Sequence, residues 1–191
     1  MSILDPSRNA LAKIDTPALV SAGIGGSLVL LAYVIVFRNE KESYVKSRFW
    51  VGINESTATA LIPLQLAAAI GYIVFILYAS GVADKRPQRG ILTYLNGYSL
   101  TLSIWVFSIA SILWPFSTQW YLDGSQTLHR ALLPASSLIL AAVAAIVMTA
   151  GAFEADLRWP AILGIIAFSS VVVMADAVGW QSKLILGAKA N

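Results

Sequence analysis

The sequence predicts an all-α integral membrane protein, a polytopic helix bundle with about five transmembrane helices. Of its 191 residues, 58% are hydrophobic and only 12% are charged, whereas about 25% of the residues of a soluble domain are charged. The apolar residues are gathered into long runs separated by polar connectors. A bilayer core of roughly 30 Å requires about 20 apolar residues in a helix, because each unpaired backbone group in hydrocarbon costs several kcal/mol.

These runs predict one transmembrane domain over residues 17–186. A polar N-terminal segment, 1–16, precedes it, and a short C-terminal tail, 187–191, follows it. The spans are expected near residues 18–37, 57–80, 91–114, 131–153 and 159–181.

Residues that favour helix starts precede the first two spans. Thr16 stands before Pro17 at the first apolar run, and Ser56 follows Asn54 and Glu55 ahead of the second. Ser and Thr side chains accept hydrogen bonds from the free N–H groups of a first turn, and proline favours the first helical position. We therefore expect Thr16 and Ser56 to be the N-caps.

Prolines mark the later spans. Pro115 follows Trp114, and because proline removes a backbone donor from a helix, the third span is expected to end there. The fourth span covers residues 131–153, and the fifth begins with Trp159 and Pro160, where the proline lies in the first turn.

Aromatic residues occur in two connectors. In the first, Tyr44, Phe49 and Trp50 lie among basic residues, which indicates either a segment among lipid headgroups or an ordinary solvated loop. In the third, Trp120 and Tyr121 follow Trp114, which indicates an aromatic belt at the membrane edge.

The orientation of the bundle is not predicted. Cytoplasmic loops carry an excess of Lys and Arg, but with the N-terminus inside the count is six inside against seven outside. The inner six are Arg8, Lys13, Lys85, Arg86, Arg89 and Arg158, and the outer seven are Arg38, Lys41, Lys46, Arg48, Arg130, Lys183 and Lys189.

Two spans open with similar sequences. ALIPLQLAAA begins at Ala60 and ALLPASSLIL begins at Ala131, 71 residues later. A duplicated pair of helices, 60–116 and 131–182, is one interpretation, and chance similarity between apolar helices is the other.

Asp176 is the ionisable residue that the fifth span encloses, and such residues often mark ion or proton paths. It lies four residues before Trp180, about 6 Å of helix rise, and Trp side chains favour the membrane interface. Lys183 is seven residues further on, nearly on the same helical face. We expect a boundary carboxylate that is partly paired with Lys183. The alternative is a role in transport.

The third span carries the most polar side chains. Tyr94, Thr101 and Ser108 share one helical face, and Asn96 lies on a second polar row beside it. With Gln65 of the second span, these residues and Asp176 form the candidate polar pathway. The alternative is that they make hydrogen bonds between helices.

Small residues predict close helix packing. Ser137, Ala141, Ala145 and Thr149 recur at a spacing of four in the fourth span. The first span contains GIGG, with Ala22 and Gly26 as its candidate packing residues. Small residues let helix backbones approach closely in lipid. We expect these six residues to form packing seams within the bundle or with a partner.

No catalytic chemistry is predicted. The chain has no cysteine and one histidine, His129, which excludes disulfides and the usual Cys and His metal sites. No nucleophile elbow, phosphate-binding loop or pair of intramembrane carboxylates occurs. We therefore expect no enzyme activity and no cofactor, and the lipid bilayer and other membrane subunits or a second copy as partners, with no nucleic acid.

The leading functional hypothesis is a non-catalytic structural or accessory subunit of a larger membrane assembly, such as an organellar complex or a membrane-containing particle. The main alternative is a small channel or transporter that uses the polar third span and Asp176. A weaker alternative is a lipid-binding membrane protein.

Overall fold

The computed structural model describes residues 15–38, 48–50, 53–83, 98–124, 127–155 and 157–189. Within these ranges the regular structure is helical and no residue lies in a strand. The elements are α1 (Thr16–Arg38), the 3₁₀ turn η3 (Arg48–Trp50), α2 (Glu55–Ala79), α4 (Tyr98–Asp123), α5 (Leu128–Glu154), α6 (Trp159–Ser170), the π-helical segment η4 (Val171–Trp180) and α7 (Gln181–Lys189).

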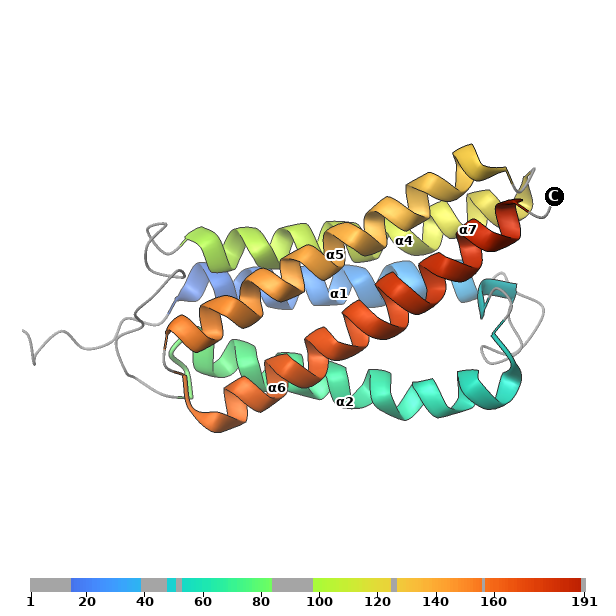
Figure 1. The fold of residues 1–191 in the computed structure, drawn as a ribbon. Coiled ribbons are helices and arrows are strands. Elements are labelled where there is room, and N and C mark those ends of the chain that lie inside the picture. The colour runs from blue at the N-terminus through green and yellow to red at the C-terminus, as the bar shows by residue number, and fades with distance from the viewer. Residues whose placement is uncertain are drawn as a thin grey trace, which may run out of the picture.

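Five helices in the described part of the chain are long and apolar enough to cross a membrane, the last of them running through α6, η4 and α7. The prediction of an all-α bundle is confirmed, and the chain has the form of an integral multi-pass membrane protein. Figure 1 shows α6, η4 and α7 as one long helix that runs beside α5, and both of these run obliquely to α1 and α4. Helix α4 packs between α1 and α5, α5 packs against α6 and η4, and α2 packs mainly along α6.

The two segments that resemble each other, 60–116 and 131–182, pack so that each helix of one segment lies against a helix of the other. The first helix of one copy, α2, packs on the second helix of the other, α6, while α4 packs on α5 in the same way. Pro63 and Pro134, the prolines of the two similar sequences, both lie inside their helices. A two-fold axis between two copied hairpins produces this pairing, and the duplication itself stays a hypothesis.

Both expected N-caps are wrong, because the capping residue stands one residue earlier at α1 and two residues earlier at α2. The Asp15 side chain accepts a hydrogen bond from Ala18 N (3.0 Å), and the Asn54 side chain accepts one from Thr57 N (2.8 Å). Thr16 therefore lies within the first turn of α1, and Ser56 lies within that of α2. Carboxylate and amide oxygens at these positions reach the free N–H groups that the hydroxyls were expected to satisfy.

The expected end of the third span at residue 114 is also wrong, because α4 continues through Pro115 to Asp123. Proline is tolerated within membrane helices, where neighbouring helices and local adjustments compensate for the lost backbone bond, and Pro115 is buried among such neighbours. The expected start of this span, 91–97, lies outside the described residues. The third connector is correspondingly short.

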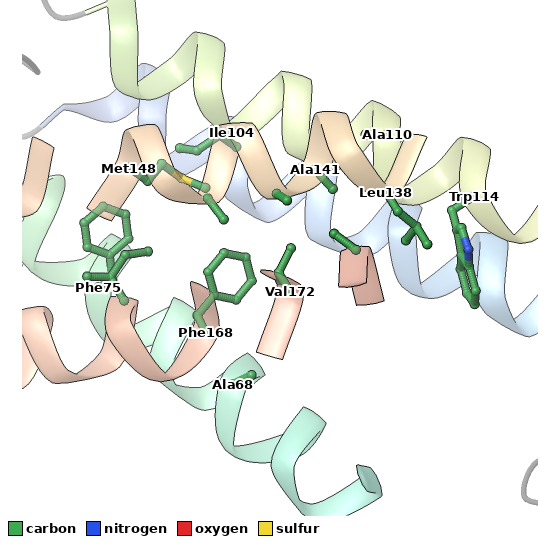
Figure 2. Packing of buried hydrophobic residues seen from close by; sticks show 14 of the residues in the cluster. Ala68, Phe75, Ile104, Ala110, Trp114, Leu138, Ala141, Met148, Phe168 and Val172 are labelled. Atoms are coloured by element: carbon green, nitrogen blue, oxygen red, sulfur yellow. The ribbon is translucent and has the colours of Figure 1, made fainter. Parts of the chain in front are cut away.

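The core is apolar along the length of the bundle (Figure 2). Met148 of α5 and Ile104 of α4 lie near each other, and Phe75 of α2 and Phe168 of α6 lie below them in this view. Exposed Leu, Ile and Val side chains cover much of α1 and α2, as expected for helices in contact with lipid.

Candidate functional site

Helices α2 and α6 meet at two glycines. A Cβ atom added to Gly71 would lie 2.5 Å from the carbonyl oxygen of Gly164, and a Cβ added to Gly164 would lie 2.5 Å from that of Gly71. The two backbones are therefore in direct contact, which only glycine permits. Sequence reasoning missed this pair, although Ala67 and Gly71 stand at the spacing of four that indicates close packing.

Helices α1 and α4 meet at Gly25 and Ser108. A Cβ added to Gly25 would lie 2.9 Å from the Ser108 Cβ, so the serine occupies the space that the glycine leaves. Gly26, the predicted packing residue, has no atom within 4 Å of such a Cβ in the described part of the chain, whereas Ala22 is half-buried against the core. Within GIGG, Gly25 is the glycine at the helix contact.

The predicted seam on α5 faces α6 at one end. The Thr149 Oγ1 and Ser169 Oγ atoms lie 2.7 Å apart, and each is within hydrogen-bonding distance of the Ala145 carbonyl oxygen (2.8 and 3.1 Å). Ala141 is buried further along the helix, and the buried Ser137 hydroxyl donates to Pro134 O of its own helix (2.8 Å).

The candidate pathway residues are spread over three elements. Gln65 is half-buried on α2, Thr101 and Ser108 lie on α4, and Asp176 lies on η4. Ser108 is held in the contact with α1, and the Thr101 hydroxyl is buried without a hydrogen-bond partner among the described residues. Tyr94 and Asn96 lie outside the described residues.

Asp176 is partly exposed as a residue, but its Oδ1 atom is buried and has no hydrogen-bond partner in the part of the chain that the structure describes. The expected pairing with Lys183 is absent from these described residues. An α-helix returns to nearly the same face after seven residues, but a π-helix takes about one residue more for each turn. Since η4 spans Val171–Trp180, Lys183 is turned away from Asp176.

Trp180 is only 3% exposed and lies inside an aromatic cluster, so its ring faces the interior of the bundle and not lipid headgroups. Its Nε1 donates to Phe49 O (2.7 Å), and its ring centroid lies 4.8 Å from that of Trp50 and 4.6 Å from that of Trp114. Phe49 and Trp50 of the first connector are thus buried against the bundle, in contrast to both the headgroup segment and the solvated loop that were expected.

The expected aromatic belt is reduced to one exposed ring. Trp120 is 46% exposed, and the Arg130 guanidinium lies 4.6 Å from its ring centroid, whereas Trp114 and Tyr121 are buried. Near them, the exposed Arg48 and Asp123 form an ion pair at 2.5 Å. Trp114 is six residues from Trp120, about 9 Å of helix rise, so Trp180 beside it lies well inside this end of the bundle.

Three buried polar atoms lie toward the C-terminal end of α4. Trp114 Nε1, Thr118 Oγ1 and Tyr121 OH are all buried without a hydrogen-bond partner among the described residues. Spacings of four and three put these three side chains on one face of α4. We call Trp114, Thr118 and Tyr121 the polar row. The spacing of four and three residues can be read from the sequence. It was missed because the helix was expected to end at Pro115.

The described residues contain no group of three or more His, Asp or Glu side chains that could hold a metal ion. Comparisons with protein family models, with functionally described proteins and with solved structures find no match to this chain.

Proposed function

We propose that the chain is a non-catalytic structural or accessory subunit of a larger membrane assembly. The observation that carries this proposal is the use of small residues at the helix contacts, above all Gly71 against Gly164 and Gly25 against Ser108. Small-residue seams let helix backbones pack in direct contact, and we take this close packing to favour a rigid bundle. Rigid packing suits a scaffold better than a carrier whose helices must move.

The outer face of α1 supports the proposal. Gly23 and Ser27 are exposed one turn apart, and the Ser27 hydroxyl donates to Gly23 O (2.8 Å), which satisfies its polar group locally. A Cβ on Gly23 would meet nothing within 4 Å in the described chain. Such a small-xxx-small face allows another helix to come close, and we assign it to a helix of a partner subunit or of a second copy.

Substitutions on this face test the proposal. Gly23→Leu and Ser27→Leu should weaken association with the partner at least tenfold while the isolated chain stays at least as stable as the wild type. Val34→Leu is the matched control, because Val34 is also exposed on α1 but offers no close approach. If association is unchanged in both α1 variants, this face of α1 no longer supports the proposal.

The second candidate is a small channel or transporter. It is favoured by one observation, the buried and unpartnered Asp176 Oδ1 in a π-helical segment, since π-helical turns are frequent at functional sites. In reconstituted vesicles, the subunit proposal predicts background flux of ions and small solutes for the wild type. A wild-type flux that Asp176→Asn abolishes would reject the subunit proposal in favour of this one.

A further inference from the structure

The guanidinium of Arg130, in the first turn of α5, is held against the end of α4. Its central carbon lies 4.6 Å from the centroid of the Trp120 ring, a distance at which a cation is attracted to the ring. A Cβ atom added to Gly124, the residue that follows α4, would overlap Arg130 Nη1 and lie 2.7 Å from Cζ. The guanidinium therefore fills the space that this glycine leaves. Its position is fixed by a ring on one residue and by the absence of a side chain on another.

Neither contact neutralises the charge of Arg130. In the part of the chain that the structure describes, Arg130 forms no ion pair and no hydrogen bond. The exposed Asp123, at the end of α4, is paired with Arg48 instead. A guanidinium carries five N–H donors in a planar fork that matches two oxygen atoms of a phosphate or a carboxylate. Arg130 thus presents a fixed positive charge to an anion.

This end of the bundle is positively charged. Helices α1, α4 and α7 end here, and α2 and α5 begin here (Figure 1). Tyr121 of the polar row forms a buried cluster with Ala131 and Leu184, which brings the next residues in sequence, Arg130 and Lys183, to the same level of the bundle. The described side chains at this end are four basic and two acidic, a net charge of +2: Arg38, Arg48, Arg130 and Lys183 against Glu55 and Asp123.

An exposed apolar surface extends from Arg130 toward the middle of the bundle. Phe116 is 40% exposed one turn before Trp120 on α4, and Leu133 is 52% exposed three residues after Arg130 on α5. Helices α4 and α5 are antiparallel neighbours, so both side chains lie on the hydrocarbon side of Arg130. Exposed Trp side chains favour the membrane interface. An anion at Arg130 therefore lies at the depth of lipid headgroups, with acyl chains beside it.

We propose that Arg130, positioned by Trp120 and Gly124, binds the phosphate of an anionic membrane lipid whose acyl chains lie along Phe116 and Leu133. A carboxylate of a partner subunit would also match the guanidinium, but it would leave the two apolar side chains unused, and so would a free phosphate ion. This inference does not depend on the subunit proposal, because a scaffold and a carrier both meet lipid at this surface.

Native mass spectrometry of the purified chain in a non-ionic detergent tests the site, with dioleoyl phosphatidylglycerol as the probe. The wild type should bind this lipid about tenfold more tightly than Arg130→Gln, because the lost hydrogen bonds join two charged groups. Gly124→Ala should weaken binding to a similar degree although every charge is kept. Its added methyl group displaces only the end of a flexible side chain, so the fold is retained.

Arg38→Gln is the matched control. Arg38 is exposed at the same end of the bundle, but it makes no cation–π contact with a described ring. This variant loses the same charge and should bind phosphatidylglycerol nearly as the wild type does. Equal losses of affinity in Arg130→Gln and Arg38→Gln would overturn the proposal, because the lipid would then respond to net charge alone.

Three further outcomes would also overturn it. Displacement of the lipid by millimolar inorganic phosphate would show a site for the free ion. Loss of a partner subunit from Arg130→Gln, with lipid binding unchanged, would assign the guanidinium to a protein carboxylate. Wild-type affinity for dioleoyl phosphatidylcholine equal to that for phosphatidylglycerol would show that this end of the bundle does not select an anionic headgroup.

Discussion

Gly71 of α2 and Gly164 of α6 face each other so closely that a methyl group on either would lie 2.5 Å from the carbonyl oxygen of the other. This contact joins α2 to the rest of the bundle, because α2 packs mainly on α6. Gly71→Ala and Gly164→Ala should each lower the free energy of unfolding by about 1–3 kcal/mol, the usual cost of overpacking. Denaturant titration in mild detergent measures the change.

Gly26→Ala is the control for these two variants, because its added methyl group meets nothing within 4 Å in the described chain. Alanine favours a helix over glycine by about 1 kcal/mol, so this variant should be as stable as the wild type or more so. If Gly71→Ala and Gly26→Ala behave alike, α2 and α6 do not meet as described.

Ser169→Ala should destabilise the bundle modestly. The Ser169 hydroxyl lies 2.7 Å from Thr149 Oγ1 and 3.1 Å from Ala145 O, and hydrogen bonds between membrane helices contribute about 0.6 kcal/mol on average. Ser136→Ala should have no measurable effect, since Ser136 is exposed and bonds only its own helix at Leu133 O (2.9 Å). Equal unfolding free energies for the two variants would contradict a hydrogen bond between α5 and α6.

The bond from Trp180 to Phe49 O predicts a larger effect. Trp180→Phe keeps an aromatic ring in the cluster but removes the indole N–H that donates to Phe49 O, which should cost about 0.5–1.5 kcal/mol of unfolding free energy. Trp120→Phe, at an exposed ring, should change it by less than about 0.5 kcal/mol. Protease cleavage near residues 48–50 should also increase in Trp180→Phe alone. Unchanged cleavage and stability would show that these residues are not anchored by Trp180.

Substitutions at Asp176 and Lys183 distinguish a buried pair from an unpaired acid. Breaking a buried ion pair costs about 3–5 kcal/mol. Since the described structure contains no such pair, Lys183→Ala should leave the unfolding free energy unchanged. Asp176→Asn, which removes a charge from an enclosed position, should not lower it. If both variants lose several kcal/mol of unfolding free energy, Asp176 and Lys183 are paired as the sequence suggested.

The parts of the fold that depend on length and composition could be predicted from the sequence. A span needs about 20 apolar residues whatever its neighbours are, so the helices at 18–37, 57–80, 131–153 and 159–181 were found within a few residues of their ends. The end at Pro115 was missed because the cost of a proline depends on whether neighbouring helices compensate for the lost bond.

The contacts of the candidate site were less predictable. GIGG indicated close packing, but choosing Gly25 over Gly26 requires the position of Ser108 on another helix. The relation between Asp176 and Lys183 was inferred with α-helical spacing, and no local signal announces the π-helical segment that separates them. Trp180 was assigned to the interface by its residue type, although Phe49 and Trp50 enclose it.

The central claim, that this chain is a subunit of a larger assembly, is tested most directly by native mass spectrometry after its isolation from its own membrane in mild detergent. The account predicts a complex of fixed stoichiometry that is heavier than the 20.5 kDa chain and is lost in Gly23→Leu but kept in Val34→Leu. A single 20.5 kDa chain, together with solute flux in reconstituted vesicles, would contradict it.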